Sequence, residues 1–311
     1  MKVVIMDTGS IDHGDLSWEA FDRFGEVKMF SDVAGEQEAI RRIGDAEILV
    51  NNKTAITEKV LDACKNLKMI TELATGYDNV AVEYAASLGI PVYNVPEYAT
   101  GSVAQYTIAL LLELSHHIGM HDTSVKAGDW SKSKDFCYWL TPQVELAGKT
   151  LGIIGYGKIG KKVAEIAHSL DMRVIAYSPH YEDGVSLDEI YAESDIISLN
   201  CRATKENREF ICSESIARMK DGVWIINTAR GALINEQDMA DALASGKVGA
   251  FAADVASHEP INPDNPLLTA PNCIITPHIA WTATACRQRA LETTIENIEG
   301  FLSGQEQNRV N

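Results

Sequence analysis

The feature that most constrains the fold is a regular alternation of short β-branched runs with helix-like stretches along the 311-residue chain. The first third contains five runs with strand character, at residues 2–6, 26–30, 46–50, 67–71 and 90–94. A second series begins near Lys149. Such alternation is typical of parallel sheets whose strands are connected by helices. Two series of this length predict an α/β protein with two doubly wound parallel-sheet domains rather than one barrel.

The length of the chain favours the same division, because one hydrophobic core rarely grows beyond roughly 250–300 residues. We assign residues 1–99 and 286–311 to a flavodoxin-like domain and residues 100–285 to a second domain. An apolar helix over 102–119 is expected to connect them. An amphipathic helix over about 282–303 is long enough to return to the first domain.

Charge and cysteine usage exclude several classes of protein. The formal net charge of −17 disfavours a nucleic-acid-binding or anionic-membrane surface. No apolar run approaches the ~18 residues of a membrane span, and the N-terminus lacks a signal peptide. The six cysteines form no C-x-x-C pair, which indicates reduced core thiols. We therefore expect a cytoplasmic protein.

The segment over 121–150 is irregular and rich in Trp and Tyr, which is typical of an arm that packs on a partner subunit. A homodimer is the expected assembly. Three nearby histidines, His116, His117 and His121, do not predict a metal site, because Gly119 interrupts the helix and no carboxylate or cysteine completes a ligand set.

A glycine-rich turn opens the second domain after a strand pattern: Gly155, Gly157 and Gly160, with Lys158 and Ile159 between the last two. The first Gly allows the tight turn, the second lets the backbone approach a pyrophosphate, and the third permits close helix–sheet packing. The following helix offers unpaired N–H groups to the phosphates. The sequence therefore predicts dinucleotide binding in the second domain.

The tip of the next strand leaves the choice of dinucleotide open. An acidic residue usually binds the adenine ribose there, but this chain has Ser178 at that position. Ser178 could bind a ribose or a phosphate, and Arg202 and Lys205 follow the neighbouring strand. We expect NAD as cofactor, and NADP is not excluded.

Three residues in a fixed order, Arg230, Glu259 and His278, each follow a buried-strand pattern. Reduction of a 2-oxo acid requires a group that holds the carboxylate, one that polarises the carbonyl and one that delivers a proton. The planar guanidinium of Arg230 suits the first two. His278 suits the third, and Glu259 would keep its imidazole protonated and oriented.

At these motifs the chain resembles the D-isomer-specific 2-hydroxyacid dehydrogenase family over essentially its whole length. The matching pieces are LATGYDNV (73–80), SVAQYTIALLLEL (102–114), GYGKIG (155–160), NTARGALI (227–234), AADVASHEP (252–260) and TPHIAW (276–281). Within the family, the runs 50–57, 66–80 and 135–155 look most like glycerate dehydrogenases, also called hydroxypyruvate reductases.

The resemblance implies roles for further residues. Backbone N–H groups around Thr75 and Gly76 are implied to hold the substrate carboxylate, and Trp139 to reach toward the pocket of a dimer partner. Thr107, Thr228 and Asp254 are implied to lie near the nicotinamide. Trp281, three residues after His278, is either a packing residue or a residue that shapes the substrate pocket. Arg230, Glu259 and His278 keep the roles given above.

We therefore predict an NAD(P)-dependent dehydrogenase of a small D-2-hydroxy acid, with hydroxypyruvate or glyoxylate as the best candidates for the oxidised substrate. One alternative is a nucleotide-sensing binding module on the same scaffold, like the family's corepressors. Another is a formate dehydrogenase, against which the presence of Glu259 counts. The sequence leaves the physiological substrate and direction open.

Overall fold

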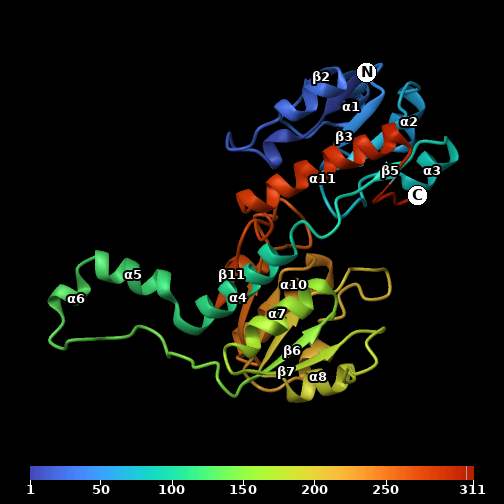
Figure 1. Cartoon of the computed structure of the whole chain (residues 1–311). Coiled ribbons are helices and arrows are strands. Elements are labelled where there is room, and N and C mark those ends of the chain that lie inside the picture. Colours follow the sequence, from blue (N-terminus) through green and yellow to red (C-terminus); the bar gives the residue numbers. More distant parts are fainter. Residues whose placement is uncertain (306) are drawn as a thin grey trace. The chain divides into compact units, whose positions relative to one another are not determined.

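A computed structural model describes residues 1–305 and 307–311 and divides the chain into two compact units. Unit 1 comprises Met1–Ala99 and Trp281–Asn311, and unit 2 comprises Thr100–Ala280. Each unit is built on one sheet whose strands all pair in parallel (Figure 1). The predicted α/β class with two parallel sheets is confirmed.

Unit 1 has a five-stranded sheet in the order β2-β1-β3-β4-β5, the flavodoxin-like arrangement. Alternate side chains of each strand enter different cores: Val4 and Ile70 face α1, α2 and α3, while Val3 and Met69 face α11. The elements are β1 Lys2–Ile5, β2 Glu26–Met29, β3 Ile48–Asn51, β4 Met69–Glu72, β5 Val92–Tyr93, α1 Glu36–Ile43, α2 Glu58–Ala63, α3 Val82–Ser87, α11 Thr284–Ser303 and the 3-10 helices η1 Thr8–Ser10 and η2 Glu19–Phe24.

The C-terminal helix α11 belongs to unit 1, as expected for a helix that returns to the first domain. Its Arg287 guanidinium donates to the Asp15 carboxylate at 2.8 and 2.6 Å, and Asn297 donates to the Asn94 carbonyl at 2.9 Å. The C-terminal part of unit 1 begins at Trp281, five residues before the expected boundary at 286. The Trp281 ring already packs against the core of unit 1.

Unit 2 has a six-stranded sheet in the order β11-β10-β9-β8-β6-β7. Its central strands read as continuous apolar runs because helices cover both faces. The elements are β6 Thr150–Ile154, β7 Arg173–Tyr177, β8 Ile196–Leu199, β9 Val223–Asn227, β10 Val248–Ala253, β11 Cys273–Ile275, α4 Thr100–His116, α7 Lys158–His168, α8 Leu187–Glu193, α9 Ser213–Ala217, α10 Glu236–Ser245, η3 Gly231–Leu233 and η4 Pro266–Leu268. The strand order reverses beside β6, which is where such sheets bind ligands.

The segment between α4 and β6 forms an extended arm of unit 2 that carries the short helices α5 Ile118–Lys126 and α6 Asp129–Lys132 (Figure 1). The helix expected over 102–119 ends earlier, at His116, because His117 has a left-handed backbone with φ 47°. Three aromatic residues of the arm are exposed: Trp130 at 52%, Phe136 at 88% and Trp139 at 69%. Within a single chain this apolar surface is therefore largely uncovered.

Residues 1–305 and 307–311 contain neither a membrane-spanning helix nor a cluster of metal ligands. No helix is long and apolar enough to cross a bilayer. No group of three or more His, Cys, Asp or Glu side chains is arranged to hold a metal ion.

Candidate active site

Eight of the predicted site residues in unit 2 follow the carboxyl ends of successive strands. They are Gly155 after β6, Ser178 after β7, Arg202 after β8, Thr228 and Arg230 after β9, Asp254 and Glu259 after β10, and His278 after β11. Because all six strands are parallel, these residues share one edge of the sheet. This edge is the ligand-binding edge of open α/β sheets.

The glycine turn has the geometry of a dinucleotide cradle. Gly155 has φ 99°, and a Cβ there would lie 2.5 Å from the Cys201 nitrogen. A Cβ on Gly160 would lie 2.2 Å from the Gly155 carbonyl oxygen, whereas one on Gly157 would meet no atom within 4 Å. The turn is thus tightly packed on its protein side and open at Gly157. The N-terminus of α7 begins directly afterwards, at Lys158, so the turn fits a pyrophosphate.

Ser178 and Arg202 flank this turn. The Gly155 N–H donates to the Tyr177 carbonyl at 2.8 Å, and the Asn200 N–H donates to the Ile154 carbonyl at 2.7 Å. Ser178 is half-buried and Arg202 is exposed. The space between them is where an adenosine would lie in this fold.

Asn200 is a residue that the sequence analysis missed. Its side-chain oxygen Oδ1 is buried and finds no donor in the described part of the chain. Buried polar atoms are rarely left unpaired in native structures. An orphaned acceptor beside the glycine turn is consistent with a polar ligand at this point.

Thr107 and Thr228 come together as a pair. Their hydroxyl oxygens are 2.7 Å apart, which joins α4 to the end of β9, and Thr107 also donates to the Val103 carbonyl at 2.8 Å. Two residues 121 positions apart in the sequence are therefore neighbours, as expected if both serve the same end of the cofactor.

Arg230 is exposed and lies in a turn that is fixed by Asn227. The Asn227 side chain donates to the Arg230 carbonyl at 2.9 Å and accepts from the Ala229 N–H at 3.0 Å. The next residue, Gly231, permits a close approach: a Cβ there would lie 1.9 Å from the carbonyl carbon of Ala256. The sequence analysis missed both Asn227 and Gly231, which together place the Arg230 turn against the loop that leads to Glu259.

Glu259 and His278 form the predicted pair. His278 Nδ1 lies 2.7 Å from Glu259 Oε2, and Glu259 Oε1 accepts from the Ala256 N–H at 3.1 Å. The two side chains are 33% and 39% exposed, respectively for His278 and Glu259. No group in residues 1–305 or 307–311 bonds to His278 Nε2, so that nitrogen can exchange a proton with a ligand.

Asp254 holds the loop that carries His278. Its side chain is buried and accepts from the Thr276 hydroxyl at 2.6 Å, the Ile279 N–H at 2.9 Å and the Ala280 N–H at 2.7 Å. The sequence analysis placed Asp254 only near the nicotinamide. In the structure it also determines the backbone conformation on both sides of His278.

Thr75, Gly76 and Trp281 belong to unit 1. The Thr75 hydroxyl donates to the Val95 carbonyl at 2.8 Å, and the Asn94 side chain donates to the Thr75 carbonyl at 2.8 Å. The N–H groups of Thr75 and Gly76 have no acceptor among the described residues. The loop is thus fixed with two adjacent backbone donors unused, as a carboxylate-binding loop requires.

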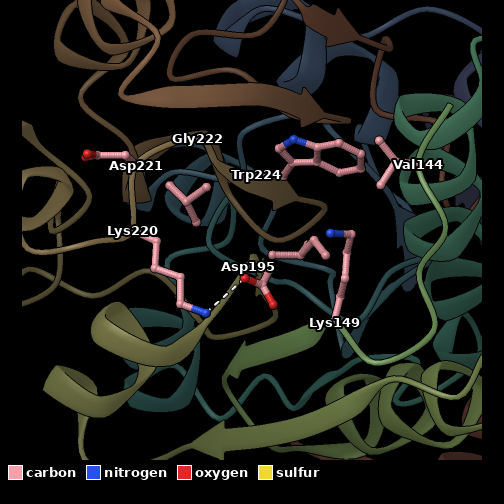
Figure 2. A pocket seen from close by; sticks show the side chains of 9 residues that line it. Val144, Lys149, Asp195, Lys220, Asp221, Gly222 and Trp224 are labelled. Carbon is pink, nitrogen blue, oxygen red and sulfur yellow. Dashed lines mark hydrogen bonds and ion pairs between the residues drawn. The ribbon is translucent and has the colours of Figure 1, made fainter. Parts of the chain in front are cut away.

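A cavity of about 320 Å³ in unit 2 lies elsewhere, at the amino ends of β6, β8 and β9. Figure 2 shows the Lys220 ammonium paired with the Asp195 carboxylate there, at 2.9 Å. The cavity contains none of the predicted site residues.

The comparisons with known proteins agree with this geometry. Residues 108–280 match the family described as "D-isomer specific 2-hydroxyacid dehydrogenase, NAD binding domain". A hydroxypyruvate reductase from Blautia hydrogenotrophica is 46% identical, with both chains covered completely. A glycerate dehydrogenase from Methylorubrum extorquens is 37% identical over 99% of this chain and 98% of that protein.

A crystal structure of a protein from Thermus thermophilus superposes with a TM-score of 0.90 at 32% identity and covers both chains completely. The predicted NAD(P) cofactor and the oxidoreductase class acting on CH–OH groups are confirmed by these matches. The chain belongs to the D-isomer-specific 2-hydroxyacid dehydrogenase family.

Proposed function

We propose that this protein reduces hydroxypyruvate or glyoxylate to the corresponding 2-hydroxy acid. The observation that carries the proposal is the 2.7 Å contact between Glu259 and His278, with the other ring nitrogen of His278 unused. The relatives from Blautia hydrogenotrophica and Methylorubrum extorquens, named for hydroxypyruvate reduction and glycerate oxidation, support the choice of substrate.

Each residue has a defined part in this reaction. When bound, the nicotinamide supplies the hydride that reaches the carbonyl carbon. Arg230 binds the substrate carboxylate and polarises the carbonyl through its planar guanidinium. His278 Nε2 donates the proton to the carbonyl oxygen, which becomes the hydroxyl group. Glu259 stabilises the imidazolium before that transfer. The unused N–H groups of Thr75 and Gly76 also bind the carboxylate.

The cofactor is proposed to lie along the carboxyl edge of the unit 2 sheet. Gly155, Gly157 and Gly160, with the N–H groups of Lys158 and Ile159, would receive the pyrophosphate. Ser178 and Arg202 would flank the adenosine. Thr107, Thr228 and Asp254 would serve the nicotinamide half.

Initial rates with a panel of substrates test this function. NADH and NADPH are each combined with hydroxypyruvate, glyoxylate, pyruvate and a branched 2-oxo acid, and formate with NAD⁺ is the opposite-direction control. We expect the highest kcat/KM with hydroxypyruvate or glyoxylate. Turnover of formate alone, or of no substrate while cofactor still binds, would contradict the proposal and favour the formate dehydrogenase or the binding-module alternative.

We also propose a homodimer in which the arm packs on a second copy of the chain and Trp139 reaches toward the partner's pocket. The exposed Trp130, Phe136 and Trp139 support this interface. Light scattering should give twice the mass of the 34.0 kDa chain. Phe136→Ser combined with Trp130→Ser should yield monomers, and a monomeric wild type would contradict the interface. The cytoplasmic location stays a prediction, which cell fractionation tests.

A further inference from the structure

Glu72 is a fully buried carboxyl group that the proposed reaction does not use. It is the last residue of β4, and none of its surface is exposed. Its Oε1 accepts from the Asn51 side chain at 2.7 Å, and its Oε2 accepts from the Asn79 side chain at 3.4 Å. Glu72 thus connects the end of β3 to the loop that follows Thr75 and Gly76.

Around Glu72 there are more hydrogen-bond acceptors than amide hydrogens offered to them. The Asn51 and Asn79 side chains also donate to the carbonyl oxygens of Thr54 and Asn52, at 3.0 to 3.3 Å. Two amide groups offer four hydrogens. The acceptors are five, namely two carbonyl oxygens, both Glu72 oxygens and Asn51 Oδ1, which is buried and has no donor among the described residues. A proton on Glu72 would add a donor to a cluster in which the acceptors outnumber the amide hydrogens.

The charges around Glu72 agree with that proton. The pKa of Glu72 is raised to about 8: burial is the main cause, the nearby Asp7 adds to the rise, and the Asn51, Asn79 and Lys53 groups act in the opposite direction. Asp7 follows β1 and is itself buried, with the N–H groups of Lys53 and Thr54 each 2.7 Å from its Oδ2. Two buried carboxyl groups therefore lie at this end of the sheet, and a negative charge on one disfavours ionisation of the other.

We propose that Glu72 is a neutral carboxylic acid that positions the substrate-binding loop, and that its ionisation weakens the binding of an anionic substrate. The inference rests on the proposed function of Thr75 and Gly76. Glu72 lies three residues before Thr75. A negative charge there repels a carboxylate and removes a hydrogen from the bonds that join the two loops. Glu72 itself does not touch the substrate, so it is a positioning residue.

The test uses oxamate, an unreactive analogue of a 2-oxo acid, bound to the full protein loaded with NADH. Its dissociation constant is measured between about pH 7 and pH 9 in wild type, Glu72→Gln, Glu72→Ala and the exposed control Glu83→Gln. All four proteins share every titratable group other than the one replaced, so a difference between them reports on the replaced residue. We expect wild type and Glu83→Gln to lose roughly tenfold more affinity across this range than Glu72→Gln. Glu72→Ala should bind weakly at both ends.

Equal losses in wild type and Glu72→Gln would overturn the proposal, as would a Glu72→Gln protein that binds as weakly as Glu72→Ala at the lower pH. Infrared difference spectra give a readout that needs no substrate. The carbonyl band of a protonated carboxylic acid should disappear as the pH rises through 8 in wild type, and should be missing in Glu72→Gln. If the enzyme reduces no 2-oxo acid, the proposed function fails, but this band still reports on Glu72.

Discussion

At the carboxyl ends of both sheets, a buried aspartate fixes a neighbouring loop, but the two loops differ in what they present. Asp7 follows β1 and Asp254 follows β10, and both side chains are buried. Each accepts hydrogen bonds from backbone N–H groups and one threonine hydroxyl of a neighbouring loop: Asp7 from residues 52, 53 and 54, Asp254 from residues 276, 279 and 280. In both units a buried carboxylate fixes a loop before any ligand arrives.

The two sheet ends differ in the exposure of the other acidic residue near each aspartate. In unit 2 the fixed loop presents His278, paired with Glu259 at 39% exposure. In unit 1 the neighbouring acid is Glu72, which is fully buried. A partly hydrated carboxylate can stay charged and stabilise an imidazolium, whereas a buried one beside another negative charge is held neutral. Exposure therefore distinguishes the acid proposed to assist proton transfer from the acid proposed to position the loop.

Replacing His278 by Ala tests the exposed half of this comparison and has the largest expected effect. The kcat should fall by about 10²–10⁴-fold, because the acid that protonates the carbonyl oxygen is lost. The dissociation constant of NADH, followed by fluorescence titration, should stay close to wild type. A variant that keeps most of its turnover would remove His278 from the mechanism.

The buried acid Glu72 predicts how the free energy of unfolding depends on pH. Because the pKa of Glu72 is raised to about 8 in the folded protein, the folded state holds more protons than the unfolded chain in the window between about pH 4.5 and 8. Stability is fully present below that window and falls as the pH rises through it, by up to about 5 kcal/mol. Urea unfolding at several pH values measures this. The Glu72→Gln protein should lack this component, and an identical slope in both proteins would mean that Glu72 is ionised throughout.

Exchanging Asp7 and Asp254 for Asn, one at a time, sharpens the comparison between the two loops. Each change replaces an acceptor by an amide whose NH₂ faces backbone donors, which costs about 1–3 kcal/mol of stability. The kinetic effects should differ. Asp254→Asn should lower kcat, because it loosens the loop that carries His278. Asp7→Asn should mainly raise KM, because it loosens the loop at residues 53 and 54, which Asn79 joins to the loop of Thr75 and Gly76. Steady-state kinetics with the preferred 2-oxo acid separates the two outcomes. Loss of kcat alone in both variants would show that the loops do not have separate roles.

The smallest expected effect comes from adding an exposed acid to unit 2. Ser178→Asp places a carboxylate where Ser178 and Arg202 would flank the adenosine. It should weaken NADPH binding by roughly tenfold through repulsion of the 2′-phosphate, and leave or improve NADH binding. Direct titration of both cofactors checks this, with Ser178→Ala as the uncharged control. Unchanged affinity for NADPH would place the 2′-phosphate away from Ser178.

The fold was predictable because its signals are local. Alternating apolar runs define the strands, and parallel order then places Arg230, Glu259 and His278 at one edge whatever the loops do. The glycine turn at Gly155 is equally local, since its spacing encodes its geometry.

The supporting contacts could not be predicted, since they join residues far apart in the sequence. Asp7 binds a loop more than forty residues later, and nothing in its own segment distinguishes it from an ordinary turn acid. Glu72 is the last residue of an apolar strand, a position at which a solvated acid is equally common. The importance of Gly231 follows from a contact that the sequence does not reveal: the Ala256 backbone occupies the space that a side chain at Gly231 would need.

The backbone conformation of His278 affects which mutations of such an enzyme are tolerated over generations. His278 has φ 57°, a left-handed conformation that suits glycine and is unfavourable for most other residues by about 1–2 kcal/mol. Mutation to glycine would relieve this strain. We therefore expect a glycine variant to be more stable and, on the proposed mechanism, inactive. If His278 has the proposed role, the histidine is kept at this position by selection for turnover and against the preference of its backbone.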